Sequence, residues 1–341
     1  MTTVSASASQ QGVPEFARFA IGFDHRDRAR LHALIDEVLD SERWSEASMV
    51  ARFETAWEAY HDAPAVALSS WAGGALAALH FAGVAGETVL CPSNTFMATP
   101  LAAIRSGAEV QFVDCNREDL CMSFADFQRA AEQFQPRAAF LVHVGGHIAF
   151  DTERIAQYCR DHEIFLIEDC AHAHGAGWNG RRAGTWGDAG VYSLYATKTI
   201  TTGEGGVLVS RRPEVIEHGR SFRNYGKPSY DVAGLNFRMS EIAGALGLVQ
   251  IERLPEIVAW KNEVARTRLD GLYPSRLELP EGMVSGLYKY IVFDWLERST
   301  GRVYSEPCHR IMGHDIELPN SDWVAANHSC VPLYYRPSTG A

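Results

Sequence analysis

The chain has 341 residues, of which 46% are hydrophobic and 21% are charged. These proportions are close to those of soluble globular domains and exclude a disordered, collagen-like or coiled-coil protein. At about 150 residues per domain, the length indicates two domains, or one large domain with a smaller companion. The formal net charge of −11, without a basic block, argues against partners that are nucleic acids or membrane surfaces.

The seven cysteines include no C-x-x-C pair, which argues against a zinc ribbon, and their odd number argues against a disulfide framework. No apolar run approaches the roughly 20 residues of a membrane helix. The first 12 residues have neither the basic nor the apolar region that is typical of a secretory signal. We therefore interpret residues 1–15 as a disordered tail and expect a cytoplasmic protein.

Helices and strands alternate along the first half of the chain. Apolar residues recur at helical spacing in 26–40 and 48–60, which predicts two amphipathic helices. Short apolar runs then predict strands at 65–70, 88–93, 108–114, 138–144 and 164–170. The predicted helices among them are 72–84, a segment within 94–107 that ends at Gly107, and 152–162. Such alternation is typical of βαβ units and a mostly parallel sheet.

The second half is less regular. It contains two more predicted strands, 187–197 and 204–210, and a long predicted helix over 240–254 that Pro255 ends or kinks. We place the domain boundary there, with a large domain over 16–255 and a smaller α+β domain over 256–341. In the smaller domain the pattern predicts a strand at 288–297, then a turn and short helix at 302–312.

Polar residues gather where the predicted strands end. They are Ser69, Ser70, Ser93, Asn94, Thr95, Asp114, His143, Glu168 and Asp169. Ligands of open α/β sheets bind outside the carboxyl ends of the strands. We therefore expect the functional site at this edge of the sheet.

Two residues in this pattern suggest chemistry. Asp169 lies where an apolar strand ends, a place where a carboxylate either pairs with a protonated ligand nitrogen or caps the next element. Lys198 lies among hydroxyls and glycines between apolar segments. Lysines are usually surface charges, but these flanks favour a desolvated lysine, whose lowered pKa leaves a free amine that attacks carbonyls.

Three further patterns are weaker. The small residues at 70–74 start a helix, where backbone N–H groups bind phosphate or simply pack closely on the sheet. Segment 175–180 matches G-x-G-x-x-G, but a loop-like stretch follows it, so we reject a dinucleotide site. A histidine-based metal hydrolase remains an alternative, although its ligands would not share one helix face as in H-E-x-x-H; its candidate ligands are His143, His147, His172 and His174.

Taken together, these segments resemble the sugar aminotransferases of the DegT/StrS type, which depend on pyridoxal 5'-phosphate (PLP) and have the fold-type-I scaffold. The similarity extends from about Phe53 to Leu254 and is strongest in IEDCAHAHGAGWNGRRAGTWGDAGVYSLYATKTITTGEGG, residues 167–206. Supporting stretches are PSNTFMATPLAAIRSGAEVQFVD, LVHVGG and GLNFRMSEIAGALGLVQIERL. The resemblance implies an α/β fold with a mostly parallel central sheet flanked by helices, followed by a smaller C-terminal α+β domain.

The resemblance implies roles for residues around the cofactor ring. Lys198 corresponds to the lysine that forms a Schiff base with PLP. Asp169 corresponds to the carboxylate that pairs with the protonated pyridine nitrogen and so keeps the ring an electron sink. His172 occupies the position beside the phenolic oxygen, and Phe96 that of the aromatic residue that stacks on the ring.

Around the phosphate the resemblance implies a second set of contacts. Ser193 corresponds to a hydroxyl donor, and the backbone N–H groups of Ala72 and Gly73 face the phosphate at a helix start. Asn236 corresponds to an amide that reaches the phosphate from the neighbouring subunit, which implies a homodimer with shared active sites.

One motif departs from the family pattern. The Ser-Gly-Thr phosphate loop of the family reads Ser70-Trp71-Ala72 here, so a hydroxyl is lost and a large ring replaces glycine. Trp71 must then point away from the phosphate, either into the helix–sheet packing or towards the mouth of the substrate site. We expect the mouth, because a core position would require a partner for its indole N–H.

The resemblance therefore implies amination of a keto-sugar, linked to a nucleotide, with glutamate or glutamine as amino donor and no metal. A keto-cyclitol aminotransferase of the aminoglycoside type and a PLP-binding regulatory or idle homologue are the alternatives. A sugar 3-dehydratase is disfavoured, because it would carry histidine at the position of Lys198.

Overall fold

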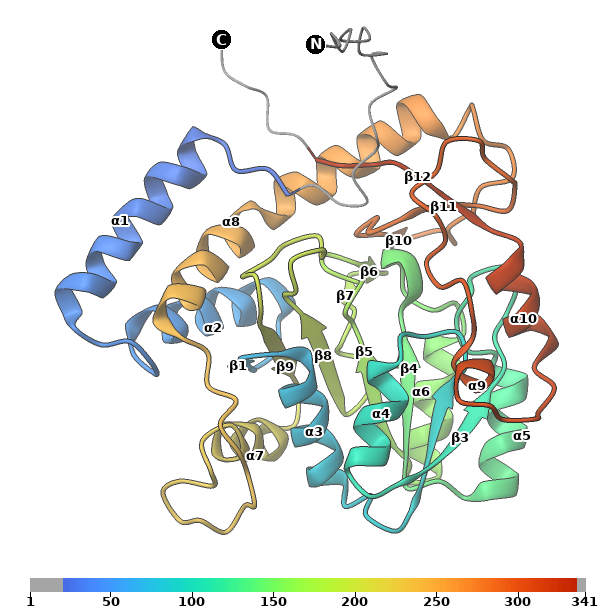
Figure 1. Ribbon diagram of the computed structural model, residues 1–341, viewed down its shortest axis with the longest axis horizontal. Coiled ribbons are helices and arrows are strands. Elements are labelled where there is room, and N and C mark those ends of the chain that lie inside the picture. The colour runs from blue at the N-terminus through green and yellow to red at the C-terminus, as the bar shows by residue number, and fades with distance from the viewer. Residues whose placement is uncertain (1–20, 336–341) are drawn as a thin grey trace, which may run out of the picture.

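The computed structural model describes residues 21–335 (Figure 1). The tail predicted at 1–15 lies outside the described residues. The chain enters through α1 (His25–Ser41) and α2 (Ser48–His61), which agree with the two predicted amphipathic helices. Both pack against α8 (Glu241–Val264), a long helix from the second half of the chain.

A seven-stranded sheet lies at the centre of the molecule. Its order is β1 (Ala65–Leu68), β9 (Gly206–Val209), β8 (Ala189–Ser193), β5 (Phe165–Asp169), β4 (Ala138–Val142), β2 (Thr88–Pro92) and β3 (Glu109–Val113). Strand β9 is antiparallel to both of its neighbours, and the remaining neighbouring pairs are parallel. The mostly parallel sheet predicted from the sequence is confirmed, and its burial on both faces explains the continuous apolar runs.

Helices cover both faces of the sheet. Strand β4 shows the division: Phe140 packs into the core on one face and Leu141 into the core on the other. The face of Phe140 is covered by α3 (Trp71–Ala82), α4 (Ala98–Arg105) and α7 (Pro213–Phe222). The opposite face is covered by α2, α5 (Phe124–Phe134), α6 (Thr152–Asp161) and α8. Helix α5 was not predicted from the sequence.

Helix α8 continues through Pro255 to Val264. Proline removes one backbone donor from a helix, but the buried side chains of Leu254, Ile257 and Val258 hold this stretch against the core. The predicted domain boundary at residue 255 therefore falls inside a helix and not in a linker. The division into a large and a small domain stays a prediction.

The C-terminal part packs across the carboxyl ends of β2 and β3. Short strands β11 (Tyr290–Val292) and β12 (Ser329–Val331) pair with each other, so the strand predicted at 288–297 is much shorter than expected. Helix α9 (Cys308–Ile311) confirms the predicted short helix and donates the Cys308 N–H to the Ser93 carbonyl. Helix α10 (Pro319–Ala326) bonds Asp114 through Ser321.

The G-x-G-x-x-G segment forms a small sheet and not a helix start. Strands β6 (Gly177–Trp178) and β7 (Arg181–Arg182) pair around a turn, and β10 (Met283–Val284) joins them. This geometry agrees with the rejection of a dinucleotide site. Within residues 21–335, no helix has the length and apolar character needed to cross a membrane.

Candidate active site

The sheet brings the two predicted chemical residues to one edge. Asp169 is the last residue of β5, and Lys198 follows the neighbouring parallel strand β8 by five residues. Their charges interact, since each affects the pKa of the other. The carboxyl edge of the sheet therefore positions a carboxylate and an amine together, as expected for an open α/β sheet.

Asp169 is buried and accepts three hydrogen bonds. Its Oδ1 accepts from Trp71 Nε1 at 3.1 Å and from the Ala171 N–H at 3.0 Å, and its Oδ2 accepts from Thr99 Oγ1 at 3.0 Å. Burial raises the pKa of Asp169, while these donors and the charge of Lys198 oppose the rise. A local cap needs only the Ala171 bond, so the donors from α3 and α4 indicate a carboxylate held for a further purpose.

Lys198 is half-buried and has an altered pKa. Burial lowers the pKa of its amine to about 8, the charge of Asp169 opposes this, and Lys289 lowers it further. Its Nζ lies 5.1 Å from the ring centroid of Tyr288. The expectation of a desolvated lysine agrees with this environment.

His172 is buried between two aromatic rings. Its imidazole stacks on Tyr288 with centroids 4.2 Å apart, and Tyr304 lies 5.8 Å away. Burial, followed by the charge of Lys198, holds its pKa well below the ordinary value. Because Nδ1 accepts the Gly145 N–H at 3.4 Å, the neutral ring carries its proton on Nε2. His172 is thus a neutral hydrogen-bond donor.

The remaining predicted residues lie around this centre. Ser193 ends β8 and is buried, with its Oγ accepting the Tyr195 N–H at 3.3 Å. Phe96 precedes α4 and is 66% exposed. Asn236 is exposed in the segment between α7 and α8, where its Oδ1 accepts the Arg238 N–H. The roles of these three residues in cofactor binding stay predictions.

The start of α3 differs from the expectation at two positions. Ser70 caps the helix by accepting the Gly73 N–H at 3.2 Å, so this N–H already has a partner. Trp71 is only 7% exposed and bonds Asp169, so the prediction that it points to the mouth of the site is wrong. The buried position is stable because Asp169 supplies the partner that the indole N–H requires. The N–H of Ala72 belongs to the first turn, whose donors have no intrahelical partner.

The four histidines do not share a metal site. His143 donates through Nε2 to Glu168 at 2.8 Å and accepts the Ala149 N–H through Nδ1. His147 contacts the Asp119 carbonyl at 3.0 Å. Among the described residues, each cluster of side chains that could bind a metal contains at most one of the four. These contacts hold loops together, and the geometry does not favour the metal-hydrolase alternative.

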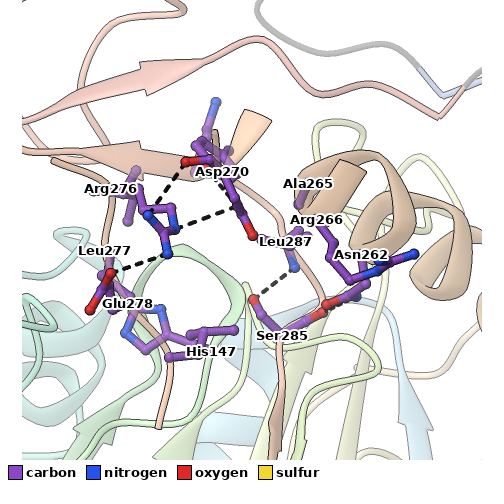
Figure 2. Close-up of a pocket in the computed structure, with 14 residues that line it drawn as sticks. His147, Asn262, Ala265, Arg266, Asp270, Arg276, Leu277, Glu278, Ser285 and Leu287 are labelled. Atoms are coloured by element: carbon purple, nitrogen blue, oxygen red, sulfur yellow. Dashed lines mark hydrogen bonds and ion pairs between the residues drawn. The ribbon is translucent and has the colours of Figure 1, made fainter. Parts of the chain in front are cut away.

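A cavity of about 450 Å³ lies beside this centre, between the end of α8 and the C-terminal segment (Figure 2). Arg276 forms ion pairs with Asp270 and Glu278 along one wall. Lys289 lines this cavity and also a small cavity that contains Lys198. The larger cavity thus adjoins the site through Lys289.

Sequence reasoning missed the site residues that come from distant parts of the chain. Tyr288 and Tyr304 belong to the irregular C-terminal segment, and Thr99 is an ordinary helix residue in the sequence. Lys261 of α8 lines the small cavity with Lys198, and burial lowers its pKa to about 8. The only signal for these residues is the general rule that ligands bind at the carboxyl edge of such a sheet.

Comparisons with known proteins agree with this fold. The chain is 31% identical to GDP-perosamine synthase of Vibrio cholerae, over 73% of this chain and 69% of that protein. It is 33% identical to dTDP-3-amino-3,4,6-trideoxy-alpha-D-glucose transaminase of Micromonospora megalomicea subsp. nigra, over 91% of each chain. The crystal structure of DesV from S. venezuelae, in complex with a ketimine intermediate, superposes with a TM-score of 0.82 at 26% identity and 90% coverage of both chains.

The family model of the DegT/DnrJ/EryC1/StrS aminotransferases matches residues 25–282. This match confirms the predicted enzyme class, an aminotransferase, and the predicted α/β fold. The chain belongs to the DegT/DnrJ/EryC1/StrS aminotransferase family.

Proposed function

We propose that this aminotransferase uses PLP to move an amino group from glutamate or glutamine to a keto-sugar linked to a nucleotide. The observation that carries the proposal is the placement of Lys198 and Asp169 at the carboxyl ends of neighbouring strands, near enough for their charges to affect each other. The names of the relatives, a GDP-sugar synthase and a dTDP-sugar transaminase, support the class of substrate.

The side chains present fit PLP. An amine with a pKa of about 8 suits covalent attachment to an aldehyde, because a substantial share of it is neutral near physiological pH. A buried carboxylate suits the ring nitrogen, and the Nε2–H of His172 suits the phenolic oxygen. When bound, PLP supplies an electron sink for charge that develops on the α-carbon of the amino donor.

Three residues of this chain would have separate roles in the transfer. Lys198 Nζ would hold the cofactor aldehyde and, when free, would take a proton from the α-carbon of the amino donor and return it as general base and acid. Asp169 would keep the ring nitrogen protonated. Tyr288 stacks on His172, and its ring centroid lies 5.1 Å from Lys198 Nζ, so this ring contributes to the orientation of both side chains.

The substrate class is tested with purified protein, PLP and a panel of ketones. Glutamate and glutamine are each offered with nucleotide-linked keto-sugars and with free keto-cyclitols, and amino product is measured by mass spectrometry. We expect product with a nucleotide-linked keto-sugar. Product only with cyclitols would support the cyclitol alternative, and no product with any ketone would support an idle homologue.

The pKa of Lys198 predicts how PLP attachment depends on pH. Its pKa is lowered to about 8 from 10.5, so the neutral amine grows as pH rises through 8. The rate at which the apo-protein becomes labelled by PLP and borohydride should rise steeply to about pH 8 and then level off. Lys289→Met removes a charge that lowers the pKa of Lys198, so in this variant the rise in labelling rate should occur at higher pH. A wild-type rate that still climbs at pH 10 would contradict the prediction.

We further propose a homodimer in which Asn236 completes the partner's site. Several large apolar side chains are exposed in residues 225–242, the stretch that contains Asn236. An isolated bridge between Ser45 and Ser240 brings Trp44 beside this stretch. The exposed apolar side chains are Trp44, Tyr225, Tyr230, Leu235 and Ile242. An apolar patch of this kind on a soluble protein is typical of an interface.

Mixed dimers test whether Asn236 acts across the interface. The Asn236→Ala variant loses one hydrogen bond to a charged phosphate. We therefore expect it to bind PLP about tenfold or more weakly than the wild type. When Asn236→Ala is mixed with Lys198→Ala, each mixed dimer keeps one intact site if Asn236 acts in trans. Activity at limiting PLP should then exceed that of either variant alone. No gain on mixing, or a fully active monomer in sedimentation, would contradict the arrangement.

A further inference from the structure

The hydrogen bonds of Asp169 are distributed unevenly between its two oxygens. Each carboxylate oxygen accepts about two hydrogen bonds. Oδ1 already accepts from Trp71 Nε1 and from the Ala171 N–H, whereas Oδ2 accepts, among the described residues, a hydrogen bond from Thr99 Oγ1 alone. Oδ1 is therefore saturated, and the acceptor position that remains belongs to Oδ2.

The donor on Oδ2 is itself fixed. Thr95 Oγ1 and Thr99 Oγ1 lie 3.0 Å apart. Because the single hydroxyl proton of Thr99 goes to Asp169, Thr95 must be the donor to Thr99. This chain of hydroxyls supplies one fixed donor to Oδ2.

The hydrogen bond between Trp71 and Asp169 satisfies a buried group on each side. The indole is 7% exposed and packs in the core beside Phe140, with ring centroids 6.2 Å apart. Asp169 provides the hydrogen bond that this buried indole N–H requires. The packing fixes the indole, and the indole fixes the carboxylate.

We propose that Trp71 is a positioning residue, which saturates Oδ1 of Asp169 and so directs Oδ2 at the ring nitrogen of the cofactor. The inference rests on the proposed function, since it requires PLP. It assigns a role to a residue where the family pattern has glycine, which has no side chain for this task. The indole thus contacts the site from the protein core, through Asp169.

The test compares PLP with its 1-deaza analogue, in which a ring C–H replaces the ring nitrogen. Both bind Lys198 through the same aldehyde, so the ratio of their dissociation constants reports the contact between Asp169 and the ring nitrogen. We expect wild-type protein to prefer PLP and Trp71→Phe to reduce this preference about tenfold, the loss expected for one hydrogen bond to a charged group. Binding is measured by equilibrium dialysis on the apo-proteins.

Trp186→Phe is the matched control. Trp186 is 9% exposed, and its indole Nε1 has no hydrogen-bond partner among the described residues. The substitution therefore removes a buried indole without removing a contact to Asp169, and the preference for PLP should not change. Should Trp71→Phe fail to fold, benzothienylalanine at residue 71 keeps a fused bicyclic ring of similar size, with sulfur in place of the N–H donor.

Each remaining outcome is decisive. An unchanged preference when the N–H is removed would reduce Trp71 to core packing and overturn the inference alone. Tighter PLP binding in Trp71→Phe would mean that the indole stands where the ring must lie, which also overturns it. A wild-type protein that binds neither compound would overturn the proposed function and the inference together.

Discussion

Lys198→Ala is expected to slow amino-group transfer by more than about 10⁴-fold. Proton transfer by a positioned side chain alone contributes about 10²–10⁴-fold, and this substitution also removes the amine that holds the cofactor. The amine is suited to both tasks because burial lowers its pKa to about 8. Transfer is measured under single-turnover conditions with glutamate.

A second lysine near the site, Lys261, is an alternative candidate for the amine that holds the cofactor. Lys261 lines the same small cavity and also has a pKa lowered by burial to about 8. Its Nζ, however, donates to the Leu287 carbonyl at 3.0 Å. Besides burial, the charge that lowers the pKa of Lys261 is that of Lys289 and not that of Asp169. The charge of Asp169 acts on Lys198 instead.

Borohydride reduction followed by peptide mapping distinguishes the two lysines. In wild-type protein the pyridoxyl label should lie on Lys198, and Lys198→Ala should carry none. Lys261→Met should keep the label and most of the activity, apart from any effect on folding. Label on Lys261 in the Lys198→Ala variant would refute the assignment.

The central sheet could be predicted because its signal is local. Strands buried on both faces appear as continuous apolar runs, and the seven strands coincide with seven such runs. The end of α8 could not be predicted in this way. Pro255 breaks isolated helices, but tertiary packing of Ile257 and Val258 holds this one together.

The site was predictable to the extent that its residues lie at the ends of strands or shortly beyond them. Asp169 ends β5 and Lys198 follows β8 by five residues, and these two strands are neighbours in the sheet. The contact between Trp71 and Asp169 joins residues 98 positions apart, and a rotamer inside a core leaves no trace in a single sequence. The same is true of Tyr288, which reaches His172 from the irregular C-terminal segment.

Asp169→Asn tests whether the carboxylate pairs with the cofactor or only caps a turn. The amide oxygen can take the place of Oδ1 and accept from Trp71 and Ala171, while Nδ2 takes the place of Oδ2. Thr99 can rotate its hydroxyl to accept from Nδ2, so the fold is expected to survive.

In this variant Nδ2–H would face the ring nitrogen as a donor. The ring nitrogen would then be unprotonated, and the ring would be a poor electron sink. We expect PLP to attach to Lys198 as before and turnover to fall by about 100-fold or more, since each loss of about 1.4 kcal/mol of transition-state stabilisation is tenfold in rate. Turnover is measured at saturating donor and ketone, with borohydride labelling as the control for attachment. Near wild-type turnover would instead show that Asp169 serves as the cap of the Ala171 N–H, because that function needs only an acceptor oxygen, which asparagine retains.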